Sequence, residues 1–370
     1  MVMLSGSQAM AASARAPKGK YGVGFRIERI SYQGRIYTVA VWYPAGKSAA
    51  APRYNYYRGF TGAAVENAPA DKSGAPYPLI IFSHGGTACG IKTVFYPENL
   101  ASFGYVVAAP DHKDADNCSV VPGRKNPDRP KDPHSTVYGY DWSFRMGEIS
   151  ATIDYFLTAN KQNGQWKNLI DPAKVGVTGH SIGGFASLMV GGVELNCEHP
   201  EDFGSIAAVA EKKGTPPSLC FQKAFQGKVL SWRDPRVKAV LSLCPAVWLI
   251  SKNSSEAAIA APVMIISGTR RDIPAESIMD TYTHLPLPRY LIMISGANHF
   301  AIEDLPPSPS LWFSPYRNWT HNREEQDIFM DYSANFFNAF LKSDPAALEF
   351  IRQSRSDRVS VQADTAENSK

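Results

Sequence analysis

The feature that most constrains the fold is a series of short apolar runs that alternate with segments of helical spacing. The run 78–82 is apolar throughout, which is typical of a strand buried on both faces of a sheet. Strands that alternate with helices predict an α/β fold, with a mostly parallel sheet of about eight strands and helices on both faces. The other predicted strands are 105–109, 175–178, 237–243, 263–267 and 290–294, and helices are predicted over 145–159 and 325–341.

An antiparallel pair is predicted at the N-terminal edge of this sheet. Residues 25–30 alternate, residues 36–43 are rich in β-branched and aromatic side chains, and Gln33-Gly34 between them is typical of a hairpin turn. Residues 44–76, rich in Ala, Pro, Gly and Tyr, are predicted to be irregular. The sequence therefore predicts a hairpin added to a parallel sheet, a common decoration of such sheets.

The chain is expected to form one folded domain over residues 21–350. The long interruption at about 190–235 suits a cap or lid insertion better than a second domain. Residues 1–20 are predicted to be a disordered tail or the remnant of a leader, and residues 351–370 a loose tail.

Composition excludes some classes of function. The chain has 370 residues, 44% of them hydrophobic, and a formal net charge of +4 whose positive residues are scattered. Scattered charge argues against a nucleic-acid partner, and no apolar run reaches the length of a membrane span. The small residues around 10–16 resemble a signal-peptidase site, so a secreted or periplasmic location is favoured over a cytoplasmic one.

The pentapeptide Gly179-His180-Ser181-Ile182-Gly183 is the strongest chemical signal. It follows an apolar strand and precedes a run of small residues that begins a helix, which is the context of a nucleophile elbow. The helix N-terminus behind Ser181 offers N–H donors to a developing oxyanion. The alternative is a glycine-rich turn in which serine only caps a helix. The context favours Ser181 as a nucleophile.

A nucleophilic serine needs a base, and the base needs an acid that orients it. Asp272 follows the predicted strand 263–267, and His299 follows the next strand, 290–294. The carboxyl ends of parallel strands meet at one edge of the sheet, where catalytic groups gather. We therefore predict a triad of Ser181, His299 and Asp272. Asp280 and Asp304 are less well placed alternatives for the acid.

The oxyanion hole is predicted from the loop Ser83-His84-Gly85-Gly86, which follows the strand 78–82. This arrangement takes one backbone N–H from such a loop and one from the residue after the nucleophile. Gly86 and Ile182 are the predicted donors. His84 and His180 adjoin them and are candidates for supporting or pocket-lining residues. No HExxH, Cys/His cluster or GxxxxGK occurs, so neither a metal nor another cofactor is expected.

Several runs resemble the dienelactone-hydrolase-like and platelet-activating-factor-acetylhydrolase-like branch of the α/β hydrolases. These runs are 40–44, 81–86, 100–112, 175–184 and 233–240. The likeness covers about residues 22–345 and implies an α/β-hydrolase fold and cofactor-free esterase chemistry. The substrates that it implies range from short acyl esters and lactones to phospholipid acetyl groups and polyesters.

One position departs from the acetylhydrolase pattern. Those enzymes look to carry their acid after the sixth strand, where this sequence has Leu243-Cys244-Pro245. A cysteine is not the charged acceptor that the imidazolium needs. The departure tilts the resemblance toward dienelactone-hydrolase-like esterases with the acid at Asp272.

Five cysteines, widely spaced, fit either two disulfides plus a buried thiol or five thiols. The strand order that the resemblance implies brings Cys89 and Cys118 close together. Cys197 and Cys220 share the cap insertion. We therefore predict the disulfides Cys89–Cys118 and Cys197–Cys220, with Cys244 as a small buried hydrophobe.

The loop 306–319 follows His299 and is rich in proline and aromatic residues. Trp312 and Phe313 are predicted to wall the substrate pocket, and the alternative is a stiff loop packed on the surface. The predicted function is a serine carboxylic-ester hydrolase with an acyl-serine intermediate. A lactonase, a peptidase or an acetylhydrolase-type lipid esterase on the same triad stays open, and so does a non-catalytic binding protein. The substrate is a small-molecule, lipid or polymer ester, and the sequence does not indicate the oligomeric state.

Overall fold

The computed structural model describes most of the chain. The described residues are 13–47, 51–57, 60–86, 88–115, 142–198, 219–221, 223–250, 259–270, 275–304 and 323–365.

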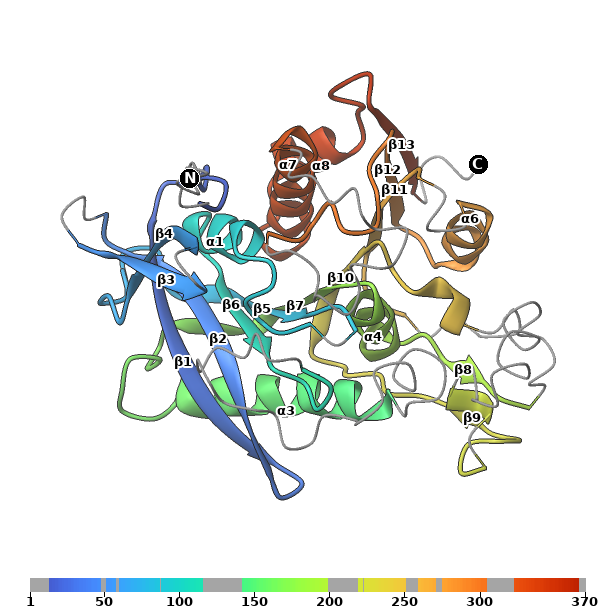
Figure 1. Cartoon of the computed structure of the whole chain (residues 1–370), viewed down its shortest axis with the longest axis horizontal. Helices are drawn as coiled ribbons and strands as arrows, with labels where there is room; N and C mark the ends of the chain where they lie inside the picture. The colour runs from blue at the N-terminus through green and yellow to red at the C-terminus, as the bar shows by residue number, and fades with distance from the viewer. Residues whose placement is uncertain are drawn as a thin grey trace, which may run out of the picture.

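An eleven-stranded sheet runs through the molecule in the order β13-β12-β11-β10-β7-β5-β6-β2-β1-β4-β3 (Figure 1). The six strands from β12 to β6 in this order are parallel to one another. Their bounds are β5 Tyr77–Ser83, β6 Val106–Pro110, β7 Ile170–His180, β10 Val237–Leu243, β11 Val263–Gly268 and β12 Arg289–Ile294. Each of these strands was predicted from its apolar run, and the mostly parallel sheet is confirmed.

The predicted hairpin is present as β1 (Gly22–Tyr32) and β2 (Arg35–Ala45). Tyr32 pairs with Arg35 across the turn, and both turn residues have positive φ, 48° at Gln33 and 77° at Gly34. Two consecutive positive φ angles match the twist of the flanking strands, which is why a residue such as Gly is needed there.

The sheet is longer than predicted because both of its edges carry strands that we did not expect. Residues 44–76, predicted to be irregular, contain β3 (Arg53–Tyr57) and β4 (Phe60–Glu66), and β4 pairs with β1. The tail 351–370, predicted to be loose, contains β13 (Val359–Asp364), which pairs antiparallel with β12. About eight strands was therefore too few.

The end of the predicted N-terminal tail is also tied to the domain. Ala14 donates a backbone hydrogen bond to Thr61, and Arg15 forms an ion pair with Asp327. Residues 1–12 lie outside the described residues. For residues 13–20, the prediction of a disordered tail is wrong.

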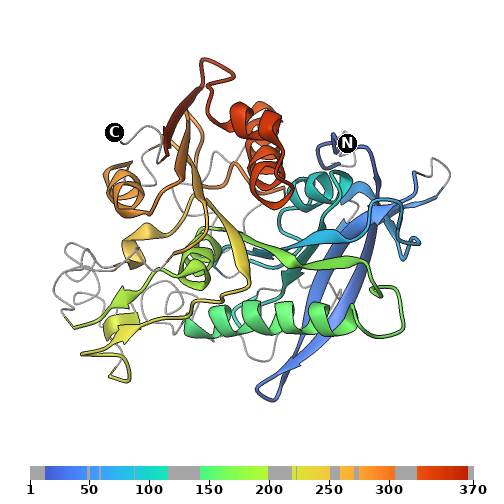
Figure 2. The same cartoon turned by 180° about the vertical axis from the view of Figure 1, so that it is seen from behind.

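Helices cover both faces of the sheet, as predicted. α3 (Ser143–Ala159) and α4 (Ile182–Gly191) pack together on one face, and α1 (Phe95–Ser102) and α7 (Arg323–Leu341) pack on the other (Figure 1). Figure 2 shows α3 along one side and α7 on the opposite side from behind. Two further helices follow β11 and α7, namely α6 (Ala275–His284) and α8 (Pro345–Ile351). The molecule has the α/β-hydrolase architecture.

The insertion at 190–235 is described only in part. It contains a small antiparallel pair, β8 (Leu195–Asn196) with β9 (Val229–Leu230), and the predicted disulfide Cys197–Cys220. Residues 199–218 and 222 lie outside the described part, so its role as a cap stays a prediction. The second predicted disulfide includes Cys118, which is also outside the described residues. Cys244 is buried, as predicted.

Candidate active site

Ser181 lies at the junction of β7 and α4. Its backbone has φ 57° and ψ −117°, a conformation that residues other than glycine seldom adopt. Two backbone hydrogen bonds hold it there, from Ser181 N–H to the Leu243 carbonyl and from Ala246 N–H to the Ser181 carbonyl, both 3.0 Å. The strand–turn–helix context predicted for the pentapeptide is therefore present, and the strain is held by neighbouring strands.

The glycines that flank Ser181 are required by the tightness of this turn. A Cβ at Gly183 would lie 1.9 Å from the Ser83 carbonyl oxygen, and one at Gly179 would lie 2.4 Å from the Gly183 carbonyl oxygen. Both contacts involve backbone atoms, which have little room to move. Only glycine at these positions lets β7, β5 and α4 meet closely enough to raise Ser181 into the site.

His299, in the loop after β12, reaches the nucleophile. Its Nε2 lies 2.9 Å from Ser181 Oγ. Burial lowers the pKa of His299 well below its usual range, and the neighbouring His180 lowers it further. The imidazole is thus neutral, the state that accepts a proton from a hydroxyl. Both residues are largely buried, since Ser181 and His299 are 9% and 8% exposed.

Asp272 lies outside the described residues, so its position relative to His299 stays a prediction. The chain enters its loop at the end of β11, where Thr269 and Arg270 donate backbone hydrogen bonds of 3.1 Å to the carbonyls of Ile294 and Ala297. These bonds tie the segment before Asp272 to the segment that leads to His299.

The two alternative acids are engaged elsewhere. Asp280 is 56% exposed on α6. Asp304 Oδ2 accepts hydrogen bonds from Val94 N–H (2.6 Å) and Phe95 N–H (2.8 Å) at the start of α1. Asp304 therefore serves the N-terminus of a helix, as carboxylates often do.

A second histidine, His180, contacts the loop of the first, which fits its place among the candidate supporting residues. His180 Nε2 donates a 2.7 Å hydrogen bond to the His299 carbonyl, and the two ring centroids are 4.7 Å apart. On its other side, His180 Nδ1 lies 3.5 Å from Glu303 Oε1. In the sequence, the role of His180 was indicated only by its position beside the nucleophile. Its partners, His299 and Glu303, are more than a hundred residues away in the chain.

The predicted oxyanion donors lie next to each other. A Cβ added at Gly86 would come within 3.2 Å of the Ile182 side chain. Ile182 is the first residue of α4, and the first N–H groups of a helix have no acceptor within it. The arrangement brings together Ser181, His299, Gly86 and Ile182.

Of the two roles predicted for His84 and His180, the contacts of their rings fit the supporting one, and the pocket-lining one stays a prediction. The side chains are 1% and 2% exposed, and their nitrogens face protein atoms. His84 Nδ1 donates to the Gly85 carbonyl (2.7 Å), while Nε2 accepts from His112 N–H (3.1 Å). These rings support the walls of the site from inside. Trp312 and Phe313 lie outside the described residues.

Beneath the oxyanion loop lies a buried charged cluster that sequence reasoning also missed. It consists of Arg145 and Glu148 on α3, together with Asp114, His112 and Ser83. In the sequence, the only sign of this cluster is that Arg145 and Glu148 lie one helical turn apart beside the apolar stripe of α3. Helical spacing alone did not show that these charges point inward.

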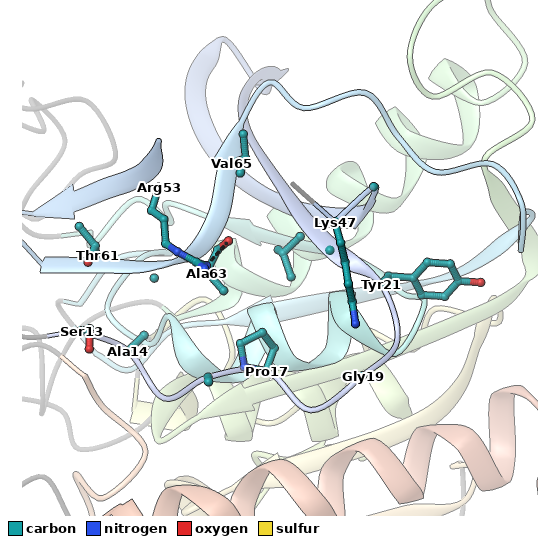
Figure 3. Close-up of a pocket in the computed structure, with 15 residues that line it drawn as sticks. Ser13, Ala14, Pro17, Gly19, Tyr21, Lys47, Arg53, Thr61, Ala63 and Val65 are labelled. Atoms are coloured by element: carbon teal, nitrogen blue, oxygen red, sulfur yellow. Dashed lines mark hydrogen bonds between the residues drawn. The ribbon is translucent and has the colours of Figure 1, made fainter. Parts of the chain in front are cut away.

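A separate cleft of about 610 Å³ opens at the other end of the sheet (Figure 3). Its walls include Tyr21, Lys47 and Arg53, and none of its lining residues belongs to the group around Ser181. Within the described part of the chain, no group of three or more His, Cys, Asp or Glu side chains is arranged to hold a metal ion. No helix there has the length and apolarity to cross a membrane.

Comparisons with known proteins bear on the fold and on one segment of the chain. Residues 45–140 match the family described as platelet-activating factor acetylhydrolase, isoform II. No curated protein matches the sequence. Solved structures of 531 chains resemble the fold. One is a ferulic acid esterase from Streptomyces cinnamoneus, 18% identical, with a TM-score of 0.64 over 96% of this chain and 99% of that one.

These comparisons confirm the predicted α/β-hydrolase fold and the resemblance to the acetylhydrolase-like esterase branch. The family match ends at residue 140, before Ser181, and the structural likeness at 18% identity shows the fold alone.

Proposed function

We propose that the chain hydrolyses carboxylic esters through an acyl intermediate on Ser181, with His299 as general base and Asp272 as the acid that orients it. The observation that carries the proposal is the 2.9 Å contact between Ser181 Oγ and a neutral His299 Nε2 on a strained nucleophile elbow. A neutral imidazole at this distance takes the serine proton as Oγ attacks the ester carbonyl.

The two half-reactions use the same groups. In the first, the tetrahedral oxyanion accepts hydrogen bonds from Gly86 N–H and Ile182 N–H, and His299 returns its proton to the departing alcohol. In the second, His299 removes a proton from water as it attacks the acyl-serine, and then gives that proton to Ser181 Oγ as the carboxylic acid departs. Asp272 is expected to hold the imidazole in the tautomer with Nδ1–H and to stabilise its charged form.

The test combines turnover with covalent labelling. We expect hydrolysis of p-nitrophenyl acetate and stoichiometric labelling by a fluorophosphonate, with mass spectrometry locating the adduct on the peptide that contains Ser181. Prior labelling should abolish hydrolysis. A protein that hydrolyses the ester but carries the adduct on another residue would overturn the assignment of Ser181.

Acetyl-ester hydrolysis is a more specific candidate, since the match to the acetylhydrolase family covers residues 45–140. That segment includes the strand and loop predicted to bind the oxyanion, but it ends before Ser181. The match therefore says nothing of which residue is the catalytic acid. A panel of acetyl, butyryl and octanoyl esters, a phospholipid with a short sn-2 acyl group, a feruloyl ester, a lactone and an amide separates these activities. Preference for acetyl esters supports this candidate, and preference for the lactone supports a dienelactone-hydrolase-like activity.

An oxidising compartment fits the disulfide Cys197–Cys220. Disulfides persist in secreted and periplasmic proteins and are rare in a reducing cytosol. We therefore propose that the enzyme acts outside the cytoplasm. Fractionation of the producing cells, with a cytosolic marker enzyme as control, tests this location.

A further inference from the structure

The most deeply buried cation of the described residues lies beneath the oxyanion loop. Arg145, in the first turn of α3, has no exposed surface. It forms an ion pair with Asp114, which is equally buried, through Nε (3.1 Å to Oδ1) and Nη2. A buried guanidinium is expensive unless its donors are all used. Two donors face Asp114, so the others need acceptors nearby.

The remaining donors of Arg145 face the backbone of the oxyanion loop. Nη1 donates to the His84 carbonyl and Nη2 to the Gly85 carbonyl at 3.1 Å. Nη1 also lies 3.3 Å from Ser83 Oγ. The planar guanidinium thus contacts three consecutive residues, Ser83, His84 and Gly85. The single ammonium group of a lysine does not reproduce these contacts.

These contacts fix the direction of an N–H group. In a trans peptide the carbonyl and the following N–H point in opposite directions. Because the Gly85 carbonyl points at Arg145, the N–H of Gly86 points away from it. Gly86 itself borders the site, because a Cβ on it would lie 3.2 Å from the Ile182 side chain.

The Gly85 carbonyl has a second donor that depends on the same cluster. His84 Nδ1 donates to it at 2.7 Å, and His84 Nε2 accepts from His112 N–H, which sets the tautomer with Nδ1–H. With the backbone N–H of Ala88, which donates to it at 3.2 Å, three donors therefore face this carbonyl oxygen. Gly85-Gly86 is a pair of residues with little conformational preference of its own, so external contacts must hold its peptide.

We propose that Arg145 is a positioning residue for ester hydrolysis: paired with Asp114, it holds the His84 and Gly85 carbonyls so that Gly86 N–H faces the oxyanion. The inference rests on the proposed function of Ser181. An oxyanion bond is made in the transition state rather than in the bound ester, so its loss lowers kcat and leaves KM nearly unchanged. Removing an oxyanion donor outright costs about 10²–10³-fold in kcat, and a donor that is only misdirected costs at most that.

The decisive variant removes both buried charges together, as Arg145→Met with Asp114→Leu. Replacing a buried ion pair by apolar residues of similar size often leaves stability unchanged or raised, so this variant separates folding from catalysis. Arg145→Lys is the second variant, because it keeps the positive charge but replaces the planar guanidinium by a single ammonium group. Arg236→Lys is the matched control, since Arg236 also pairs with an aspartate (Asp234) and contacts α3, away from the site.

Three measurements are made on each variant: thermal unfolding, kcat and KM for p-nitrophenyl acetate, and Ki of an alkylboronic acid. The tetrahedral boronate on Ser181 places an oxygen where the oxyanion forms. We expect kcat to fall about 10- to 10³-fold in the Arg145 variants, with KM within threefold and Ki weakened in parallel with kcat. The control should keep kcat within twofold.

A folded Arg145 variant that keeps kcat within twofold of the wild type overturns the proposal. So does a fall in kcat with an unchanged boronate Ki, because then the oxyanion bond was not what was lost. If the double variant does not fold, Arg145→Lys decides by the same criteria, and if that variant does not fold either, the purely structural role is the one supported. A wild type that neither hydrolyses the ester nor takes the fluorophosphonate on Ser181 contradicts the proposed function itself, a result distinct from these.

Discussion

Two serine–histidine pairs lie at the ends of neighbouring strands, and their hydrogen bonds are nearly the same length. Ser181 Oγ is 2.9 Å from His299 Nε2 at the end of β7, and Ser83 Oγ is 2.8 Å from His112 Nε2 at the end of β5. The second pair even has an acid, because His112 Nδ1 lies 2.8 Å from Glu148 Oε2. By hydrogen bonds alone, this buried cluster has all three members of a triad.

The pairs differ in access and in backbone geometry. We call Ser181–His299 the exposed pair, although its residues are at most 9% exposed, and Ser83–His112 the buried pair. Ser83 is fully buried in a regular strand, whereas Ser181 is 9% exposed on a strained turn at a helix N-terminus. Arg145 also lies 3.3 Å from Ser83 Oγ, which opposes the approach of a substrate. A short Ser–His contact therefore marks a nucleophile only where an ester and an oxyanion site fit beside it.

The largest expected effect is the loss of the exposed pair. Ser181→Ala should lower kcat by at least about 10³-fold, because no nucleophile then remains for the acyl intermediate. Ser83→Ala should keep kcat within about tenfold, since Ser83 touches only the support of the oxyanion loop. Steady-state hydrolysis of p-nitrophenyl acetate checks both. Fluorophosphonate labelling of Ser83 rather than Ser181 would reverse the comparison.

The second effect concerns the acid of the exposed pair. Asp272→Asn should lower kcat by about 10²–10⁴-fold, because the imidazole then loses the partner that fixes its tautomer and balances its charge. Asp280→Asn, on the exposed face of α6, is the control and should change kcat by less than twofold. Equal activities in the two variants would show that another residue supplies the acid, and Glu303, near His180, would be the first to test.

The exposed pair was predictable from the sequence and the buried pair was not, for a physical reason. The elbow is a local structure: glycines, serine and an apolar strand follow one another along the chain, and the partner histidine follows a recognisable strand. The contacts of Arg145 with Asp114 and Gly85 instead join residues 31 and 60 positions apart. Nothing in the spacing of α3 shows which carbonyls its charged side chains meet.

The same distinction holds for the fold. The central strands carry their own apolar signal, so β5, β7 and β10–β12 were predictable. The edge strands β3 and β13 contain polar residues at many positions and become strands by pairing with β4 and β12. Strand preference at an edge depends on the neighbour more than on the residue itself.

The third expected effect concerns Glu148, the acid of the buried pair. Burial raises the pKa of Glu148 from its usual value to about 7, although Arg35 opposes the shift. A carboxyl whose pKa is raised on folding stabilises the protein fully below its unfolded pKa, about 4.5, and this contribution is lost as the pH rises to about 7. The loss is on the order of 3 kcal/mol, since one pKa unit is worth about 1.4 kcal/mol.

Glu148→Gln should therefore remove that fall in the free energy of unfolding between pH 4.5 and 7. Urea unfolding at half-unit pH intervals checks it, with the slope compared rather than the absolute stability, because the substitution also disturbs the bond to Arg35. A variant whose stability falls with pH as steeply as that of the wild type would show that Glu148 is ionised across this range, like the acid expected in the exposed triad.

The smallest expected effect is on stability and belongs to Ser83. Ser83→Ala leaves His112 Nε2 buried without its hydroxyl donor, which should lower the free energy of unfolding by about 1–2 kcal/mol. Ser187→Ala is the matched control: its hydroxyl donates to the Gly183 carbonyl within α4, so its loss should cost about 0.5–1 kcal/mol. Urea unfolding at pH 8, above the range in which Glu148 titrates, compares the two.

A loss at Ser83 no larger than that at Ser187 would mean that His112 is held by Glu148 alone, and the buried pair would then be a contact without structural consequence. A larger loss, with activity retained, would assign stability to one Ser–His pair and catalysis to the other.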